Sequence, residues 1–339
     1  MSKYKVVYYN VDDTLELENK MLKTWGITDI ELIEVKNGAD RDKPEAFLEA
    51  VKGADGVVVE YFEITADIIS KMENTKIIAL KAIGYSNVDV EAASKHGICV
   101  TNSPGFCTEE TAVHAVGMII DCVRKITYHD RNVRAGKWDP HLGGKTFRLS
   151  GKTVGLVFFG SIPQYMVPIL KAMDLKVIVY APTKSAEYLA EFGCEKAETL
   201  EELLKTSDFV SMHTPLIKGV TYHMMGEEQF KMMKDSAFFI NTARGSVVDE
   251  PALVKALKEG WIKGAAVDVI EDEANEISDL FEIENCTITP HAAFVSEDSF
   301  TAARTIALGQ LVRRLHEQKV PENLVNKEIK DTINNGSYL

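Results

Sequence analysis

The chain has 339 residues, of which 45% are hydrophobic and 26% are charged, a composition typical of soluble globular proteins. This length exceeds that of one ordinary hydrophobic core and predicts two domains. The net charge of −13, without any basic run, argues against nucleic acid as a partner.

Neither a membrane segment nor a disulfide framework is expected. No apolar run reaches the roughly 18 residues that a membrane span requires, and no signal peptide follows MSKYK at the N-terminus. The cysteines are odd in number, scattered, and without the paired spacing of a metal site. They are Cys99, Cys107, Cys122, Cys194 and Cys286. We expect reduced thiols in a cytoplasmic protein that holds no metal.

The first hundred residues alternate apolar runs with helix-like segments. Strands are predicted at 5–9, 56–60 and 77–80, and a helix is predicted at 43–51. The sequence KAIGYSNVDVEAASKHG after the third strand predicts a glycine turn followed by a short helix.

A linker and further buried strands follow. The TNSP run at 101–104 predicts a turn or linker, and a helix is expected at 109–125. Apolar runs predict strands at 152–159, 176–180 and 208–213.

The stretch from Ala237 to Glu273 predicts a strand, a helix and a second strand. The two strands, 237–240 and 264–270, are apolar on both faces, as strands of a parallel sheet covered by helices must be. A long helix is predicted at 297–317, and Lys327–Leu339 is expected to be a frayed tail. In open α/β sheets, ligands bind beyond the carboxyl ends of the strands.

A further apolar run, CTITP at 286–290, predicts a third strand. Three polar side chains follow these three successive strand ends: Arg244, Glu273 and His291. A guanidinium can bind a carboxylate and its neighbouring carbonyl, and an imidazolium can donate a proton to the carbonyl oxygen. A glutamate can keep that imidazolium charged. Each residue alone is more often a surface, capping or structural residue, so the hypothesis of a 2-oxo acid site depends on the set of three.

The chain resembles the D-isomer-specific 2-hydroxyacid dehydrogenases from about Asp55 to Asn326. The motifs that carry the resemblance are NSPGFCTEETAVHAVG at 102–117, HTPL at 213–216, INTARG at 240–245, DVIEDE at 268–273 and TPH at 289–291. The resemblance implies that Arg244 is the substrate arginine, His291 the acid/base and Glu273 its supporting carboxylate.

The resemblance also implies the fold. It is α/β, with two Rossmann-like parallel-sheet domains separated by a cleft: a flavodoxin-like substrate domain and a doubly wound dinucleotide-binding domain. We expect the substrate domain at 1–102 and 294–339, and the dinucleotide-binding domain at 103–293. The second domain would thus be inserted into the first.

The glycine turn at Ala82, Ile83 and Gly84 occupies the position where the family offers backbone N–H groups to the substrate carboxylate. Backbone donors suit this task because they are already oriented. Phe106 lies in the PGFC loop, where related enzymes often carry tyrosine, and is a candidate contact to the substrate side chain.

The nucleotide loop departs from the family pattern. Phe158, Gly160 and Pro163 stand where the family carries three glycines, so only the glycine that lets the backbone approach a pyrophosphate is kept. Pro163 fits the first turn of a helix, whereas the bulky Phe158 predicts a reshaped loop and weaker dinucleotide binding.

A second departure is Ala181, where an acidic residue normally receives the ribose hydroxyls of NAD. Thr183, Lys184 and Ser185 could bind a 2′-phosphate instead, so NADP is slightly favoured over NAD; the alternative is a solvated loop with an incidental lysine. His213 could contact the nicotinamide or serve the loop structure. The predicted cofactor residues are Gly160, Ser161, Ile162, Ala181, Thr183, Lys184, His213, Thr214, Pro215, Thr242, Ala243 and Asp268.

The predicted function is hydride transfer between NAD or NADP and C2 of a small 2-oxo acid, which yields the D-2-hydroxy acid. The alternative is a nucleotide-sensing scaffold with little catalysis, comparable to the transcriptional corepressors that resemble these dehydrogenases; the altered glycine loop favours it. A homodimer is expected, since symmetric dimers are the commonest soluble oligomers, and the resemblance implies that the apolar helix around 112–123 pairs the two subunits.

Overall fold

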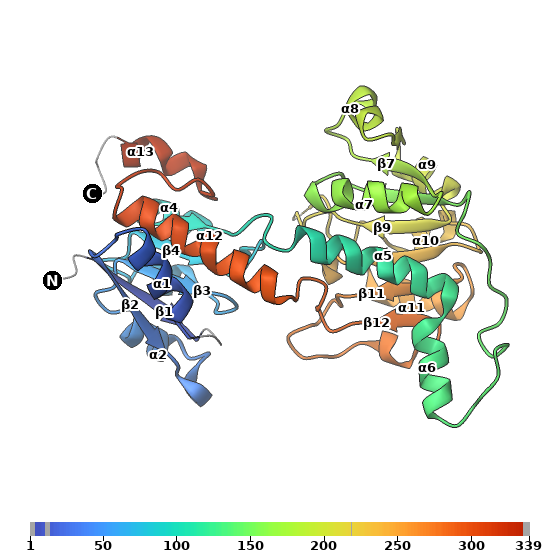
Figure 1. The fold of residues 1–339 in the computed structure, drawn as a ribbon, viewed down its shortest axis with the longest axis horizontal. Coiled ribbons are helices and arrows are strands. Elements are labelled where there is room, and N and C mark those ends of the chain that lie inside the picture. Colours follow the sequence, from blue (N-terminus) through green and yellow to red (C-terminus); the bar gives the residue numbers. More distant parts are fainter. Residues whose placement is uncertain (1–3, 11–13, 218, 335–339) are drawn as a thin grey trace. The chain divides into compact units, whose positions relative to one another are not determined.

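The computed structural model describes residues 4–10, 14–217 and 219–334. The chain forms two compact units (Figure 1). Unit 1 comprises Met1–Phe106 and Ser296–Leu339, and unit 2 comprises Cys107–Val295. Each unit has its own sheet, and every strand pair within both sheets is parallel. The predicted pair of parallel-sheet α/β domains is therefore confirmed.

The sheet of unit 1 has the strand order β2-β1-β3-β4-β5, which is the flavodoxin-like order. Its strands are β1 (Tyr4–Tyr9), β2 (Ile30–Val35), β3 (Gly56–Val59), β4 (Ile77–Leu80) and β5 (Cys99–Thr101). Successive residues of a strand point to opposite faces, so both faces of the apolar strands need a cover.

Helices supply that cover on both faces (Figure 1). On one face α1 (Glu16–Thr24) and the long α12 (Glu297–Leu315) pack over alternate strand residues such as Val6. The helices of the other face pack over the intervening residues such as Val7. They are α2 (Pro44–Ala50), α3 (Ala66–Ile69) and α4 (Val90–Lys95), and a short 3-10 turn, η1 (Gly38–Asp40), precedes α2.

The expectation of a frayed tail from Lys327 is wrong for 327–334. This segment forms η4 (Lys327–Ile329) and α13 (Lys330–Asn334). Ile329 and Ile333 are buried in the same core as α1 and α12, so apolar burial holds the segment against unit 1. Residues 335–339 lie outside the described residues.

The sheet of unit 2 has the order β12-β11-β10-β9-β6-β7-β8. Its strands are β6 (Thr153–Val157), β7 (Lys176–Tyr180), β8 (Glu195–Lys196), β9 (Phe209–Met212), β10 (Phe238–Asn241), β11 (Gly264–Val267) and β12 (Cys286–Ile288). The chain winds from β6 through β7 to one edge, and from β9 to the other. The direction of winding therefore reverses between β6 and β9, where dinucleotides bind in folds of this kind.

Helices cover both faces of this sheet as well (Figure 1). One face carries α5 (Thr108–Arg124) and α7 (Ser161–Ala172), and the other carries α9 (Leu200–Thr206), α10 (Glu227–Met232) and α11 (Glu250–Lys258). The remaining helical segments are α6 (Ile126–Arg134), α8 (Ala186–Glu191), η2 (Gly245–Val247) and η3 (Asp279–Glu282).

The apolar side chains of α5 are used within unit 2. Ala112, Ala115, Val116 and Ile119 pack into the core shared with α7 and the sheet. The apolar pattern of α5 is therefore explained by its packing against the sheet of unit 2.

All five cysteines are buried free thiols, as expected. Over the described ranges, no helix is both long enough and apolar enough to cross a membrane.

Candidate active site

The three candidate catalytic residues follow three adjacent strands of unit 2. Arg244 comes after β10, Glu273 lies in the segment that follows β11, and His291 comes after β12. Strand β11 pairs in parallel with both β10 and β12. The three residues therefore leave the sheet at the same edge.

The structure brings Glu273 and His291 into contact. Nδ1 of His291 lies 2.9 Å from Oε2 of Glu273. Both side chains are about two-fifths exposed, so solvent weakens the pair while a ligand can reach the ring. With Nδ1 held by the carboxylate, Nε2 is the atom that can exchange a proton with a ligand.

Asp268 holds the loop of residues 289–293, which we call the His291 loop. Its carboxylate is almost fully buried, at 2% exposure. Its Oδ1 accepts hydrogen bonds from the Thr289 hydroxyl and from Ala292 N–H at 2.9 Å, and its Oδ2 accepts from Ala293 N–H at 2.9 Å. The backbone N–H of His291 also donates to the Asp268 carbonyl at 2.8 Å. Asp268 was predicted to bind the cofactor, and here its oxygens serve the His291 loop.

Arg244 lies in a loop that approaches the segment after β11 very closely. Its Nη1 donates to the Ala243 carbonyl at 2.6 Å, and Asn241 Nδ2 donates to the Arg244 carbonyl at 3.0 Å. A Cβ at the next residue, Gly245, would lie 1.7 Å from the carbonyl oxygen of Ile270. Glycine is therefore required where the loop of Arg244 passes the segment that leads to Glu273.

Phe158 begins the nucleotide loop in a backbone conformation that favours glycine. Phe158 has φ of +72°, in the left-handed region, and its N–H donates to the Tyr180 carbonyl at 2.8 Å. Phe158 therefore adopts a conformation that glycine takes without strain, and its ring packs against the core beside α9, α10 and α11.

The start of α7 fits a pyrophosphate. Gly160 precedes the helix, and a Cβ placed on it would meet nothing within 4 Å, which leaves the backbone open to a close ligand. The N–H groups of Ser161 and Ile162 have no partner in the preceding turn of the helix, whereas Pro163 at the third position has no N–H. The loop therefore offers one backbone donor fewer than a fingerprint without proline.

The segment after β7 contains no carboxylate at the ribose position. Ala181 is buried and Thr183 is exposed. The ammonium of Lys184 lies 4.7 Å from the ring centre of Tyr188, and Ser185 Oγ accepts from Tyr188 N–H at 3.2 Å as the cap of α8. Lys184 is thus oriented by an aromatic ring.

Two further predicted cofactor residues have distinctive surroundings. Burial lowers the pKa of His213 to about 3, so the ring is neutral near pH 7, and its Nε2 lies 2.9 Å from Ser211 Oγ. The hydroxyl of Thr242 is buried and makes no hydrogen bond within the described part of the chain, which suits a ligand contact. Thr214 Oγ1 donates to the Pro215 carbonyl at 3.0 Å and shapes that loop.

The predicted substrate turn lies in unit 1, at the carboxyl end of β4. The carbonyl groups of Ala82 and Ile83 accept hydrogen bonds from Ser103 N–H and Asn102 Nδ2, at 2.9 and 2.8 Å. These bonds fix the orientation of the turn that ends at Gly84. Phe106, the other predicted substrate contact, closes the first segment of unit 1 and is half-buried.

Three polar contacts near these strand ends were not predicted. Lys81 and Glu60 form a buried ion pair of 3.1 Å at the ends of β4 and β3. His223 Nε2 lies 2.6 Å from Glu271 Oε1, two residues before Glu273. His114 on α5 reaches Thr289. Two features of the sequence could have pointed to these residues: Glu60 and Lys81 each end an apolar strand, and His114 interrupts an apolar helix.

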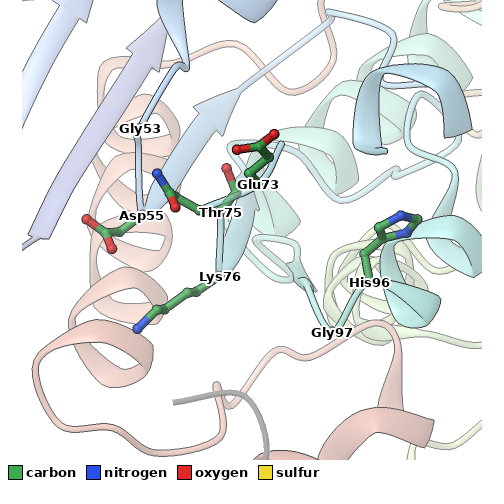
Figure 2. Close-up of a pocket in the computed structure, with 8 residues that line it drawn as sticks. Gly53, Asp55, Glu73, Thr75, Lys76, His96 and Gly97 are labelled. Carbon is green, nitrogen blue, oxygen red and sulfur yellow. The ribbon is translucent and has the colours of Figure 1, made fainter. Parts of the chain in front are cut away.

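A cavity of about 320 Å³ lies elsewhere in unit 1 (Figure 2). Asp55, Lys76 and His96 line it from the loops that precede β3, β4 and β5. These are the amino ends of the strands, opposite the edge that carries Ala82–Gly84. The cavity is therefore separate from the predicted substrate turn. Over the described ranges, no three His, Cys, Asp or Glu side chains are grouped closely enough to hold a metal ion.

Comparisons with known proteins show the family of the chain. Residues 116–293 match the family model described as the D-isomer specific 2-hydroxyacid dehydrogenase, NAD binding domain. The chain is 39% identical over 289 residues to the glyoxylate reductase of Thermococcus litoralis, covering 83% of this chain and 86% of that one. It is 36% identical over 295 residues to the D-3-phosphoglycerate dehydrogenase of Methanocaldococcus jannaschii, covering 87% of this chain and 55% of that one.

A solved structure extends the likeness to the whole fold. The holo form of D-mandelate dehydrogenase from Rhodotorula graminis superposes with a TM-score of 0.85 at 25% identity, covering 96% of this chain and 98% of that one. The matched family model, the relatives and the fold lead to one conclusion: the chain belongs to the D-isomer-specific 2-hydroxyacid dehydrogenases, nicotinamide-dependent oxidoreductases.

Proposed function

We propose that this protein reduces a small 2-oxo acid at C2 to the D-2-hydroxy acid, with Arg244, His291 and Glu273 as the groups that act on the substrate. The observation that carries the proposal is the 2.9 Å contact between His291 Nδ1 and Glu273 Oε2 at the strand edge that also bears Arg244. A carboxylate behind an imidazole is the arrangement that favours a proton-donating ring.

Each residue has a distinct task in this proposal. The planar guanidinium of Arg244 binds the substrate carboxylate and polarises the adjacent carbonyl. Nε2 of His291 donates a proton to the carbonyl oxygen as the C–H bond forms at C2. Glu273 stabilises the protonated ring and fixes its orientation through Nδ1. In the oxidation direction, neutral His291 accepts the hydroxyl proton.

The cofactor contributes the hydride when it is bound, and the chain contributes its position. The N–H groups of Ser161 and Ile162, with the open backbone of Gly160, would hold the pyrophosphate. The buried hydroxyl of Thr242 supplies a further polar contact near the end of β10.

We infer that the substrate is small. The supporting finding is that relatives at 36 to 39% identity are glyoxylate reductases. The oriented turn at Ala82–Gly84 would take the carboxylate, and Phe106 would limit the space for the side chain at C2.

The test is turnover of a panel of 2-oxo acids, from glyoxylate to aromatic members, with NADH and with NADPH. The proposal expects turnover of a small acid. Arg244→Lys should lower kcat/KM by orders of magnitude, because lysine keeps the charge but loses the planar pair of donors. Arg134→Lys, on the exposed face of α6, is the matched control and should change nothing. No turnover of any acid would favour the nucleotide-sensing scaffold.

For the cofactor, we propose NADPH over NADH by a small margin, supported by Ala181 in the ribose position and the donors of Thr183, Lys184 and Ser185. Ala181→Asp should shift preference toward NADH, because the carboxylate accepts from ribose hydroxyls and repels a 2′-phosphate. Fluorescence titration of both cofactors against both proteins measures the shift. A strong preference of the wild type for NADH would contradict the proposal and show that Lys184 stays with Tyr188.

A further inference from the structure

We propose that His114 is a positioning residue, which holds the His291 loop in its active arrangement through Thr289 and Asp268. The inference rests on the proposed role of His291 as the proton donor. His114 lies on α5, 175 positions before Thr289 in the sequence. It would act without touching the substrate.

The contacts define a short chain of polar groups. His114 Nε2 lies 3.0 Å from Thr289 Oγ1 and 3.7 Å from Asp268 Oδ1. Thr289 Oγ1 also makes a close hydrogen bond to that same Oδ1. The carboxylate is almost fully buried and the imidazole is three-quarters buried, so solvent competes little with these contacts.

Counting protons fixes the direction of each hydrogen bond. A threonine hydroxyl has one proton, and the Thr289 proton goes to the Asp268 carboxylate, which can only accept. Thr289 Oγ1 must therefore accept from His114, which requires a proton on Nε2 of His114. The chain runs from His114 to Thr289 and then to Asp268.

The far end of this chain is the backbone of the His291 loop. The same carboxylate accepts from the N–H groups of Ala292 and Ala293, the two residues after His291. His291 itself has φ of +50°, a conformation that is strained for a non-glycine residue and persists only where its surroundings enforce it. The Asp268 carboxylate helps to hold His291 in this conformation through its hydrogen bonds to the loop. His114 binds the Thr289 hydroxyl, which in turn orients that carboxylate.

Two substitutions at His114 separate a donor role from simple packing. His114→Gln places an amide N–H near the position of Nε2, whereas His114→Leu has similar bulk and no donor. Loss of the donor should lower kcat for 2-oxo acid reduction by about 10- to 100-fold, as displacements near 1 Å do at reacting groups. His114→Gln should stay within a few-fold of wild type, and the KM for the cofactor should change little in both.

Two substitutions at Thr289 test the same chain of hydrogen bonds independently. Thr289→Ser keeps the hydroxyl and should retain activity, whereas Thr289→Val removes it and should match His114→Leu. In the double variant His114→Leu/Thr289→Val, the losses should not multiply, because both changes break one chain. His141→Leu, an exposed histidine of unit 2, is the control and should behave as wild type.

A readout without catalysis keeps this inference separate from the proposed function. In cofactor-free protein labelled with ¹⁵N-alanine, the amide resonances of Ala292 and Ala293 are identified by Ala292→Gly and Ala293→Gly. We expect both resonances to shift in His114→Leu and to be retained in His114→Gln.

The outcomes are decisive in each direction. Unchanged resonances together with unchanged kcat in His114→Leu would overturn the inference. Equal losses of kcat in the Gln and Leu variants, with unchanged resonances, would also overturn it. If the wild type reduces no 2-oxo acid, the proposed function fails, and the two resonances still decide whether His114 positions the loop.

Discussion

A single residue, Phe158, holds a left-handed backbone conformation that a side chain with a Cβ disfavours. The sequence identified the substitution but not its consequence, because the conformation of the turn is dictated by the passage from β6 to α7. The left-handed conformation costs a residue with a Cβ roughly 1 to 2 kcal/mol. Packing of the ring against the core offsets part of that cost.

Replacing Phe158 by glycine and by alanine separates strain from packing. Both variants lose the ring, but only glycine adopts φ of +72° without strain. The free energy of unfolding of Phe158→Gly should therefore exceed that of Phe158→Ala by about 1 kcal/mol. Urea unfolding of the two variants measures the difference. Equal stabilities, or a more stable alanine variant, would mean that the turn relaxes to another conformation.

At the scale of elements, the strands that the sequence predicted best are those buried on both faces. In an α/β chain, short apolar runs such as Ile77–Leu80 and Phe238–Asn241 indicate central strands of a parallel sheet, because helices cover both faces of that sheet. Strand β2, IELIEV, was missed because it lies at the edge of its sheet and is half polar. The tail helix α13 was missed because two isoleucines in a polar segment carry little periodic signal.

The position of a residue relative to the predicted strands also decided which residues of the candidate site could be predicted. Arg244, Glu273 and His291 were predictable because each follows a readable strand. His114 and Glu271 were not, because their partners lie far away in the sequence and only the folded sheet brings them together. Periodicity reports which face of an element is buried, and it does not report long-range polar contacts.

The close approach at Gly245 makes a prediction about two elements at once. Gly245→Ala would place a Cβ 1.7 Å from the Ile270 carbonyl oxygen, so η2 and the segment after β11 must move apart. We expect the free energy of unfolding to fall by about 1 to 3 kcal/mol. We also expect reductase kcat to fall, because Arg244 and Glu273 flank this contact.

Gly160→Ala is the matched control for that substitution. Its Cβ would meet nothing within 4 Å, so stability should change little, whereas affinity for the dinucleotide should fall because the pyrophosphate approaches there. Chemical unfolding and cofactor titration of both variants give the comparison. If Gly245→Ala is as stable and active as wild type, the two segments do not constrain each other.

At the scale of the whole molecule, the net charge of the chain does not indicate where individual charged side chains lie. The value of −13 coexists with Arg244 and with the buried Lys81 at strand ends. The apolar stripe of α5 is buried in its own unit and so carries no information on assembly, and pairing of two chains stays a prediction. The exposed apolar residues of unit 2 include Trp138, at 88% exposure, and Ile126 and Val133 on α6.

We still expect a homodimer, now paired through this exposed surface. Light scattering should give about twice the chain mass of 37.7 kDa. Trp138→Ala should weaken the dimer by about 2 kcal/mol or more, as exposed tryptophans at interfaces do. Trp25→Ala, an exposed tryptophan of unit 1, is the control. A monomeric wild type at micromolar concentration would refute the expectation.

The central claim, that Glu273 keeps His291 protonated for reduction, is tested most directly by the pH profiles of Glu273→Gln in both directions. Glutamine keeps the shape of the 2.9 Å contact and removes the charge that favours the protonated ring. The alkaline limit of reduction should then move to lower pH, and partial exposure of both side chains to solvent limits the size of that movement.

Oxidation of the hydroxy acid, which needs the neutral ring, should gain activity at lower pH in the same variant. General damage to the site would instead depress both directions together. Profiles of Glu273→Gln that superimpose on those of the wild type in both directions would contradict the account.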